Sequence, residues 1–505
     1  MDPALNLPPE VWTRIFLFAC TVPDAFNAHP HRTRTVLQSE AREDWWRLQN
    51  DVASCRYTYR CIALVCRSWY HFSIPFFWNH LILHSIPTVI GAAHALNGSR
   101  SWALQHPYYA KSNNNFLQNG DLNSSRAPPN GGMGWFVRRI DLEIELPNPT
   151  MAENETLLRA LASILSMCPN LHIFADHAHP GPSFDDTYVL YLPDGLLSYL
   201  FRPNNNLRRV DWSANNLIPF CSHLHSAPHL RVLNLHYFTG NPLTWLGSTA
   251  GPAGVSLPFL DTLVLNEDPE CLQAEIVSTW HLPNLQTLRL EVSPDFGSDQ
   301  FLRTHGHNIT TLSLHTPISP RPFYSIAHYC SYTPNLESLF FQLHHPPFAL
   351  FQPQTNPLSQ TQALSSLKMI GIQGLLSFRG RSFDDGEEEQ LHRHLTAMVR
   401  SRARMPQLKV IRLVDFDPES WKSEQRTARE VARWQRWQLR WEMLGVRWED
   451  RDGMLMRVPD KLLELLEQRD LDDDDIYSDE EMAVDEELEG FSDYLSMSST
   501  SGMWD

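Results

Sequence analysis

Leucine and other apolar residues recur through the middle of the chain in the pattern L-x-x-L-x-L. Four copies are strict: Leu230/Leu233/Leu235, Leu260/Leu263/Leu265, Leu285/Leu288/Leu290 and Ile309/Leu312/Leu314. Looser copies begin at Val137, Leu207, Leu336, Leu367 and Leu408. Alternate residues of a strand point to one face, so the pair at spacing two predicts a short strand with one buried face. Because one such unit cannot bury that face alone, the repetition predicts strands that stack on one another over residues 135–417.

The spacing of the copies leaves room for a helix between consecutive strands. From Leu207 onward, successive copies begin 23 to 41 residues apart. The expected fold class is therefore α/β, a horseshoe-shaped solenoid of irregular leucine-rich repeats. A doubly wound α/β domain is the alternative, but it would show longer Val/Ile runs and Gly-rich phosphate turns.

Residues 1–84 carry apolar residues at helical spacing. Val11, Ile15 and Phe18 fall on one face of a first helix, and a second helix is expected around residues 62–72. Between them, an inserted loop is expected over about 22–60, where Pro, His, Thr and Asn interrupt the period. The two helices have more apolar surface than so short a segment can bury internally, so they need a partner or the neighbouring strands.

The motif L-P-P-E-x-W-x-x-I-F, followed by L-V-C-R-x-W and P-x-F-W-x-x-L, resembles the F-box. In that family a short helical module binds the Skp-type adaptor of cullin–RING ubiquitin ligases, and leucine-rich repeats joined to it recruit the substrate. The richness in aromatic residues resembles the large fungal F-box families, although the stretch between the two halves is longer than usual. The resemblance implies adaptor binding by Leu7, Pro8, Pro9, Glu10, Val11, Ile15, Phe16, Leu64, Val65, Cys66, Trp69, Tyr70 and Trp78.

The residues that flank each buried pair in the repeats are expected on the open, concave face of the sheet. Arginine and aromatic side chains are typical anchors of protein interfaces, so this face is the candidate surface for a protein substrate. The candidate residues are Arg209, Asp211, His236, Arg289, Glu291, His315, Phe340, Gln342 and Arg412. For any one of them, an ordinary solvated position on a sheet is the alternative.

Three further segments differ from the repeats in composition. Residues 85–134 are expected to form a helix and a flexible linker rich in Asn, Ser, Gly and Pro. Residues 418–469 carry Trp and Arg at helical spacing, which predicts a helical cap on the last repeat, with nucleic-acid binding as the alternative. Residues 470–505 are expected to be a disordered acidic tail, because residues 470–493 hold 13 Asp or Glu and no Lys or Arg. Most of the net charge of −17 lies there, so the nearly neutral remainder argues against DNA or RNA as the main partner.

Neither metal nor catalytic chemistry is indicated. The eight cysteines contain no C-x-x-C pair, which predicts no disulfide framework or zinc module and favours a reducing compartment, the cytoplasm or the nucleus. Cys221, His223 and His225 would share one face of a strand, but no fourth metal ligand is placed by the sequence. G-x-S-x-G, P-loop, H-E-x-x-H and G-x-G-x-x-G motifs are absent, and no apolar run is long enough to span a membrane. We therefore expect no cofactor and no membrane partner.

The F-box resemblance and the repeats together imply a non-catalytic, substrate-recruiting subunit of a Skp–cullin–F-box ubiquitin ligase. The adaptor would bind residues 1–84, and a protein substrate would bind the repeats. The alternative is a leucine-rich-repeat interaction scaffold that has an acidic tail and no role in ubiquitin transfer.

Overall fold

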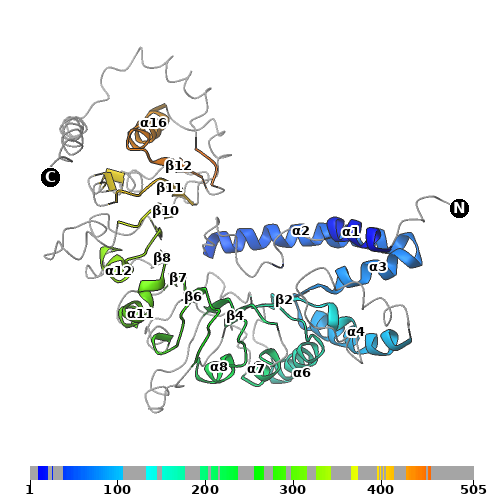
Figure 1. Cartoon of the computed structure of the whole chain (residues 1–505). Coiled ribbons are helices and arrows are strands. Elements are labelled where there is room, and N and C mark those ends of the chain that lie inside the picture. The colour runs from blue at the N-terminus through cyan, green and yellow to red at the C-terminus, as the bar shows by residue number, and fades with distance from the viewer. Residues whose placement is uncertain are drawn as a thin grey trace, which may run out of the picture.

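The computed structural model (Figure 1) covers the repeated region and the helices that precede it. The structure describes residues 9–20, 26, 38–105, 132–144, 150–176, 194–202, 206–213, 217–236, 255–266, 277–291, 297–314, 326–342, 365–373, 395–396, 398–399, 402, 405–414, 428–450 and 453–456. The expected linker lies almost wholly outside these residues, and the expected acidic tail lies wholly outside them.

In the described part of the chain, twelve strands form one parallel sheet, and their order in the sheet follows the chain. They are β1 His80–Leu83, β2 Arg139–Leu142, β3 Ile173–Asp176, β4 Arg209–Ser213, β5 Val232–His236, β6 Thr262–Asn266, β7 Thr287–Glu291, β8 Thr311–Leu314, β9 Ser338–Gln342, β10 Met369–Gln373, β11 Val410–Leu413 and β12 Arg447–Glu449. Each copy of the leucine pattern coincides with one strand, and in β5 the pattern residues Leu230, Leu233 and Leu235 are fully buried. The expected α/β class is confirmed.

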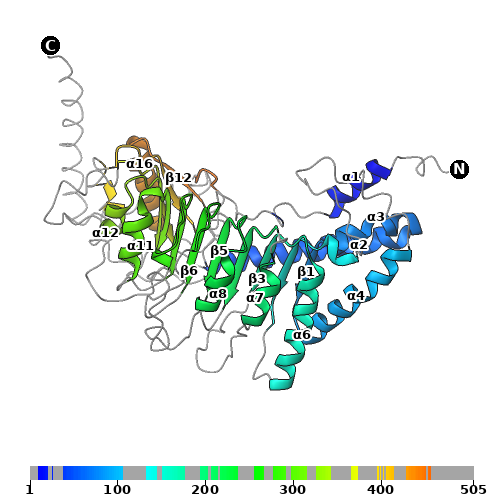
Figure 2. The ribbon, with the colours of Figure 1, turned by 60° about the horizontal axis from the view of Figure 1, so that its bottom comes forward.

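A row of helices covers the outer, convex side of the curved sheet (Figures 1 and 2). The row contains α6 Met151–Met167, α7 Asp194–Leu200, α8 Leu217–Leu224, α11 Gly297–His305 and α12 Ile326–Tyr332, and α4 Ile86–Gln105 packs beside α6. In α6 the buried residues Leu157, Leu161 and Ile164 follow a helical period and pack into the core between helices and sheet. None of the described helices combines the length and the apolar character that crossing a membrane requires.

One long helix, α2 (Gln38–Val65), runs along the inner, concave side of the sheet (Figures 1 and 2). Helices α1 (Pro9–Cys20) and α3 (Arg67–Trp78) pack against it. The loop expected over about 22–60 is therefore helical from Gln38 onward. The sequence hides this helix because its contacting side includes Arg56 together with the buried Val52 and Tyr59, so the apolar period is interrupted by a charge.

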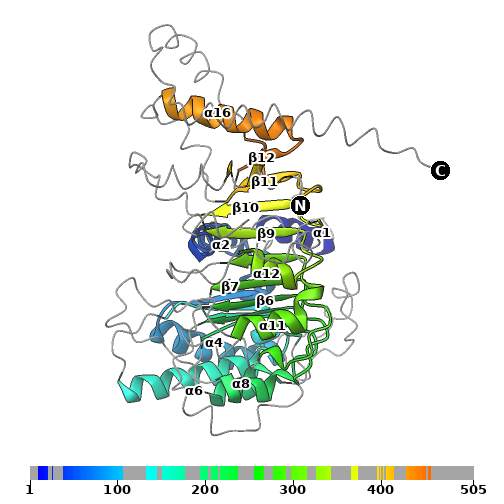
Figure 3. The same ribbon diagram turned by 90° about the vertical axis from the view of Figure 1, so that its left-hand side faces the viewer.

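The sheet extends beyond the predicted repeats (135–417) at both ends. Strand β1 pairs with β2, and β12 pairs with β11. The leucine pattern does not mark them, because Trp78 takes the first position before β1, and Trp448 takes a buried position in β12. The segment expected as a cap thus supplies both a helix, α16 (Ala428–Met443), and a last strand (Figure 3).

Asparagine side chains connect neighbouring units of the stack. The Nδ2 atoms of Asn170, Asn284, Asn308 and Asn335 donate hydrogen bonds to the backbone carbonyls of Trp135, Pro258, Pro283 and His307, at 2.9, 2.5, 3.1 and 2.7 Å respectively. Each asparagine directly precedes the buried first residue of its unit. Each bond satisfies a loop carbonyl of the preceding unit, so these bonds help to fix the spacing of consecutive units.

Candidate functional site

An aromatic cluster joins α1 to α3. The ring centroid of Trp69 lies 4.6 Å from that of Trp12 and 5.3 Å from that of Phe16, and Trp12 and Phe16 stack at 5.7 Å. Phe16 is only 1% exposed. Aromatic pairs at these separations attract one another beyond the burial of their area. The cluster therefore holds α1 in place on α3, and Phe16 is a packing residue here.

Helices α1, α2 and α3 also expose apolar residues. Of the 14 large hydrophobic residues exposed in the described part of the chain, nine lie on α1, α2 and α3. We define the apolar helical surface as Val11, Ile15, Leu17, Phe18, Leu64, Val65 and Tyr70, all of which are exposed. Phe18 is 92% exposed and Leu64 is 85% exposed. Single scattered apolar residues are the norm on a protein surface, so this concentration makes the three helices the candidate docking surface.

The break between α2 and α3 places Leu64 and Val65 at a corner of the module. Cys66 has extended backbone angles, φ −163° and ψ 167°, so the helical path stops after Val65 and restarts at Arg67. The side chains at the end of α2 thus have no following helical turn to cover them. The sequence pattern, which predicted one helix here, does not show this break.

The predicted adaptor-binding residues have several different environments. Val11, Ile15, Leu64, Val65 and Tyr70 are exposed on the apolar helical surface. Cys66 and Trp69 are half-buried, Phe16 is buried, and Trp78 packs against the core of the sheet. Pro9 and Glu10 begin α1, but their side chains lie outside the described part, as do Leu7 and Pro8 entirely.

Leu17 and Phe18 belong to the apolar helical surface although the motif does not include them. The signal in the sequence is the continuous run Ile15–Phe–Leu–Phe18, which is longer than one buried helix face requires. A run that is apolar on all sides of a short helix indicates that two faces of the helix need partners.

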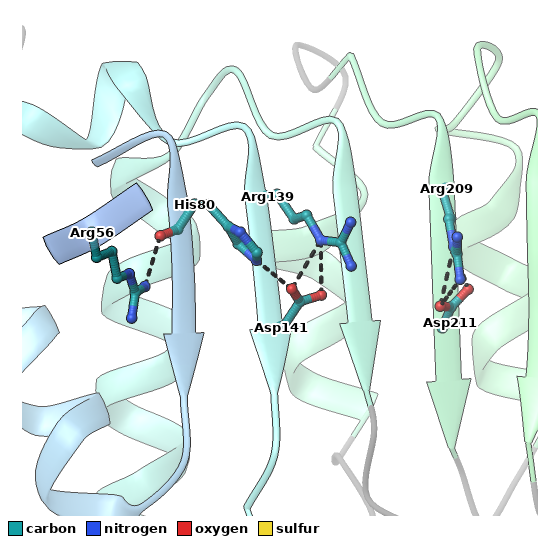
Figure 4. A network of polar contacts seen from close by, with 6 residues as sticks. All are labelled: Arg56, His80, Arg139, Asp141, Arg209 and Asp211. Atoms are coloured by element: carbon teal, nitrogen blue, oxygen red, sulfur yellow. Dashed lines mark hydrogen bonds and ion pairs between the residues drawn. The ribbon is translucent and has the colours of Figure 1, made fainter. Parts of the chain in front are cut away.

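The inner face of the sheet begins with a buried polar cluster on β1 and β2 (Figure 4). The Nε atom of Arg139 donates to both carboxylate oxygens of Asp141, at 3.1 and 2.9 Å, and His80 Nε2 donates to the same carboxylate. Asp141 is fully buried, and burial lowers the pKa of His80 although Asp141 acts in the opposite direction. The carboxylate is thus saturated by donors, which suits a structural role.

Helix α2 covers this part of the inner face. Val52 packs on Ile82 of β1, with Phe26 and Cys55 beside them. The Nη2 atom of Arg56 donates to the backbone carbonyl of His80 at 3.1 Å (Figure 4). The first strands of the sheet are therefore occupied by the chain itself and are not open to a partner.

The predicted substrate-binding residues are mostly buried or paired with each other. On β4, Arg209 forms an ion pair with Asp211 at 2.7 Å (Figure 4), and on β11 Arg412 pairs with Glu449 of β12 at 2.6 Å. Arg289 is 8% exposed and Phe340 is 2% exposed. The expectation of open side chains is wrong for these residues. Strands about 4.8 Å apart bring neighbouring side chains into contact, which the pattern of a single strand does not report.

The other predicted substrate-binding residues cannot be placed as side chains. His236, Glu291 and Gln342 are the last residues of their strands, and their side chains lie outside the described part. His315 lies entirely outside it.

The three residues nearest to a metal motif do not lie on a strand. Cys221 and His223 belong to α8, and His225 lies in the turn after it. Helical spacing turns His223 away from Cys221. Burial raises the pKa of Cys221 to about 12, so it stays a thiol. In the described residues, no three His, Cys, Asp or Glu side chains are grouped so that they could hold a metal ion.

Comparison with known proteins adds no relative to this picture. No protein-family model matches the chain. No curated protein matches it significantly either.

Proposed function

We propose that this chain is the substrate-recognition subunit of a Skp–cullin–F-box type ubiquitin ligase. The observation that carries the proposal is the apolar helical surface. Val11, Ile15, Leu64, Val65 and Tyr70, which the F-box resemblance assigns to adaptor binding, are all exposed. Exposed apolar side chains on packed helices are the feature that a protein-docking module requires.

The sheet supports the second half of the proposal. Its strands follow the chain in order and are all parallel, as expected for a solenoid of leucine-rich repeats. In this reading the module binds the ligase core and the repeats bind the protein to be modified. The chain itself supplies recognition and no catalytic step. A ligase subunit of this kind works in the cytoplasm or the nucleus.

Helix α2 connects the apolar helical surface to the sheet. It contributes Leu64 and Val65 to the apolar helical surface, and Val52 and Arg56 to the contact with β1. One rigid helix therefore extends from the proposed adaptor site onto the inner face of the sheet. A substrate held by the later strands would keep a constant position relative to the ligase core.

Binding to a purified Skp-type adaptor tests the proposal. Leu64→Asp combined with Val65→Asp should weaken binding at least ~30-fold, because loss of central interface anchors costs about 2 kcal/mol or more. Both residues are exposed, so the variant should fold, which circular dichroism checks. The matched control is Phe259→Asp with Leu439→Asp, two apolar residues that are also exposed and are remote in sequence from α1–α3.

The alternative is a scaffold that uses the same surface for another protein. It is favoured if the unaltered chain binds no Skp-type adaptor and co-purifies with no cullin. Equal adaptor binding by the Leu64/Val65 variant and the control variant would also reject the proposed site.

A further inference from the structure

The residues directly before the strands form a continuous line at one edge of the sheet. Backbone hydrogen bonds join Arg138, His172, Arg208 and Arg231 in this order, with N···O distances of 2.8, 2.7 and 2.8 Å. Parallel strands lie about 4.8 Å apart, so these four residues are direct neighbours at the amino ends of β2 to β5. We call Arg138, His172, Arg208 and Arg231 the basic row.

The positive charges of the basic row are not neutralised within the described part of the chain. No ion pair there involves Arg138, Arg208 or Arg231. Further along the same line, by contrast, Lys368 pairs with its neighbour Glu337 at 2.6 Å. The arginines one position later, on β2 and β4, are also paired with carboxylates (Figure 4). Within the described residues the three arginines of the row thus form no ion pair, although Asp261 follows Arg231 directly in the same line.

The pKa of His172 is also affected by the arginines of the row. Burial, together with the guanidinium groups of Arg138 and Arg208, lowers the pKa of His172 to about 4. Burial and the charge of Arg208 also lower the pKa of Arg138. At neutral pH His172 is uncharged, so the charges of the row are those of Arg208, of Arg138, which lies two strand spacings from Arg208, and of Arg231, which lies one spacing from Arg208. These guanidinium groups repel one another, and a bound anionic segment would relieve that repulsion.

We propose that the acidic segment 470–493 of this chain binds the basic row. The segment contains 13 Asp or Glu and no Lys or Arg, so its charge complements the row. Its nature as part of the same chain favours it over an acidic segment of another protein, because tethering gives an effective concentration in the millimolar range. The proposal does not depend on the ubiquitin-ligase function.

The length of the chain permits this contact. The described chain ends at Met456, next to β12. Seven strand spacings separate β12 from β5, roughly 34 Å along the sheet. The residues from 457 to 470 can span up to about 46 Å when extended. The acidic segment therefore reaches the row without any change in the sheet, and an anionic partner must displace it to bind there.

The test uses the full-length chain with all 13 acidic residues of 470–493 replaced by Asn or Gln, and a fluorescent peptide of the natural 470–493 sequence. We expect the peptide to bind this chain, and the affinity to fall at least tenfold between about 50 and 300 mM salt. Adding Arg138→Gln, Arg208→Gln and Arg231→Gln should lower the affinity at least tenfold. The control adds Arg14→Gln, Arg60→Gln and Lys409→Gln, three exposed cations outside the row, and should change it less than twofold.

The unaltered chain provides an independent measurement. Its own segment should occupy the row, so it should bind the peptide at least tenfold more weakly than the neutralised chain does. Equal binding by these two chains would overturn the proposal, even if the arginine variant failed to fold. Equal loss of affinity in the row variant and the control variant would also overturn it, since the attraction would then be general.

Discussion

The ring of Phe340 on β9 lies over Gly371, the residue directly opposite it on β10. A Cβ atom at position 371 would overlap with ring carbons Cδ1 and Cε1 of Phe340. Val414 and Met369 pack around the same ring, which leaves it 2% exposed. The aromatic residue expected to bind a partner is therefore a packing residue of the inner face.

We expect Gly371→Ala to lower the free energy of unfolding by about 1–3 kcal/mol, the usual cost of overpacking. Urea denaturation measures the change. Because the clash is with one ring, the double variant Gly371→Ala/Phe340→Ala should lose less than the sum of the two single variants. Additive losses would show that the ring does not lie over the glycine.

Substitutions of Trp69 and of its neighbour Tyr70 should have different effects, one on the packing of α1 and the other on adaptor binding. Trp69→Ala removes the centre of the aromatic cluster with Trp12 and Phe16, so α1 should detach and its amides should exchange faster. Tyr70→Ala removes an exposed side chain and should weaken adaptor binding with α1 protection unchanged. Hydrogen exchange and adaptor titration measure the two effects. Unchanged exchange in the Trp69 variant would contradict the cluster.

Asn335→Ala tests the asparagine bonds between units. Its Nδ2 atom donates to the carbonyl of His307 at 2.7 Å, and a net loss of about 1 kcal/mol is expected on removal. Asn97→Ala is the control, because the bond of that exposed side chain to Ser163 Oγ is long at 3.4 Å. If both variants were equally stable, the asparagine bonds would not stabilise the contact between units.

His172 should make stability depend on pH. Its pKa is about 4 in the folded chain and about 6.5 when unfolded, so the unfolded chain binds more protons between these values. The stability that neutral His172 contributes is fully present above pH ~6.5. As the pH falls towards 4, the free energy of unfolding decreases by no more than about 1.4 kcal/mol per pH unit. In the chain with the acidic segment 470–493 neutralised, so that no bound anion offsets the nearby arginines, His172→Gln should flatten the pH dependence of the denaturation midpoint over this window, with His94→Gln at an exposed site as the control. If the His172 variant lost stability more steeply as the pH falls, the pKa of His172 would not be lowered in the folded chain.

Trp441 on α16 should be essential at the last strand of the sheet. It is fully buried in the core, and a Trp→Ala change in a core costs about 3–5 kcal/mol. Leu439→Ala, two residues earlier on the exposed side of α16, is the control and should change stability little. Thermal melts compare the two. Similar melting temperatures would mean that α16 does not seal the sheet and would favour a binding role for its tryptophans.

Much of the sheet follows from the sequence alone. A strand repeats its environment every two residues, so the buried pair Leu233/Leu235 identifies β5 without any knowledge of its neighbours. The same local rule locates every strand that carries the pattern. The helical face of Val11 and Ile15, and the surplus of apolar residues around it, are likewise local properties.

Only the tertiary structure decides what faces the inner side of the sheet. Whether Phe340 is open or buried depends on a glycine 31 positions later in the chain, and the position of α2 depends on contacts of Val52 and Arg56 with β1. The basic row, too, exists only because stacking brings residues from four separate units to one edge. A sequence pattern reports how a residue relates to its own strand or helix. Contacts between units depend on register and on which chain segment comes to lie across the sheet, and these are set by packing over long distances in sequence.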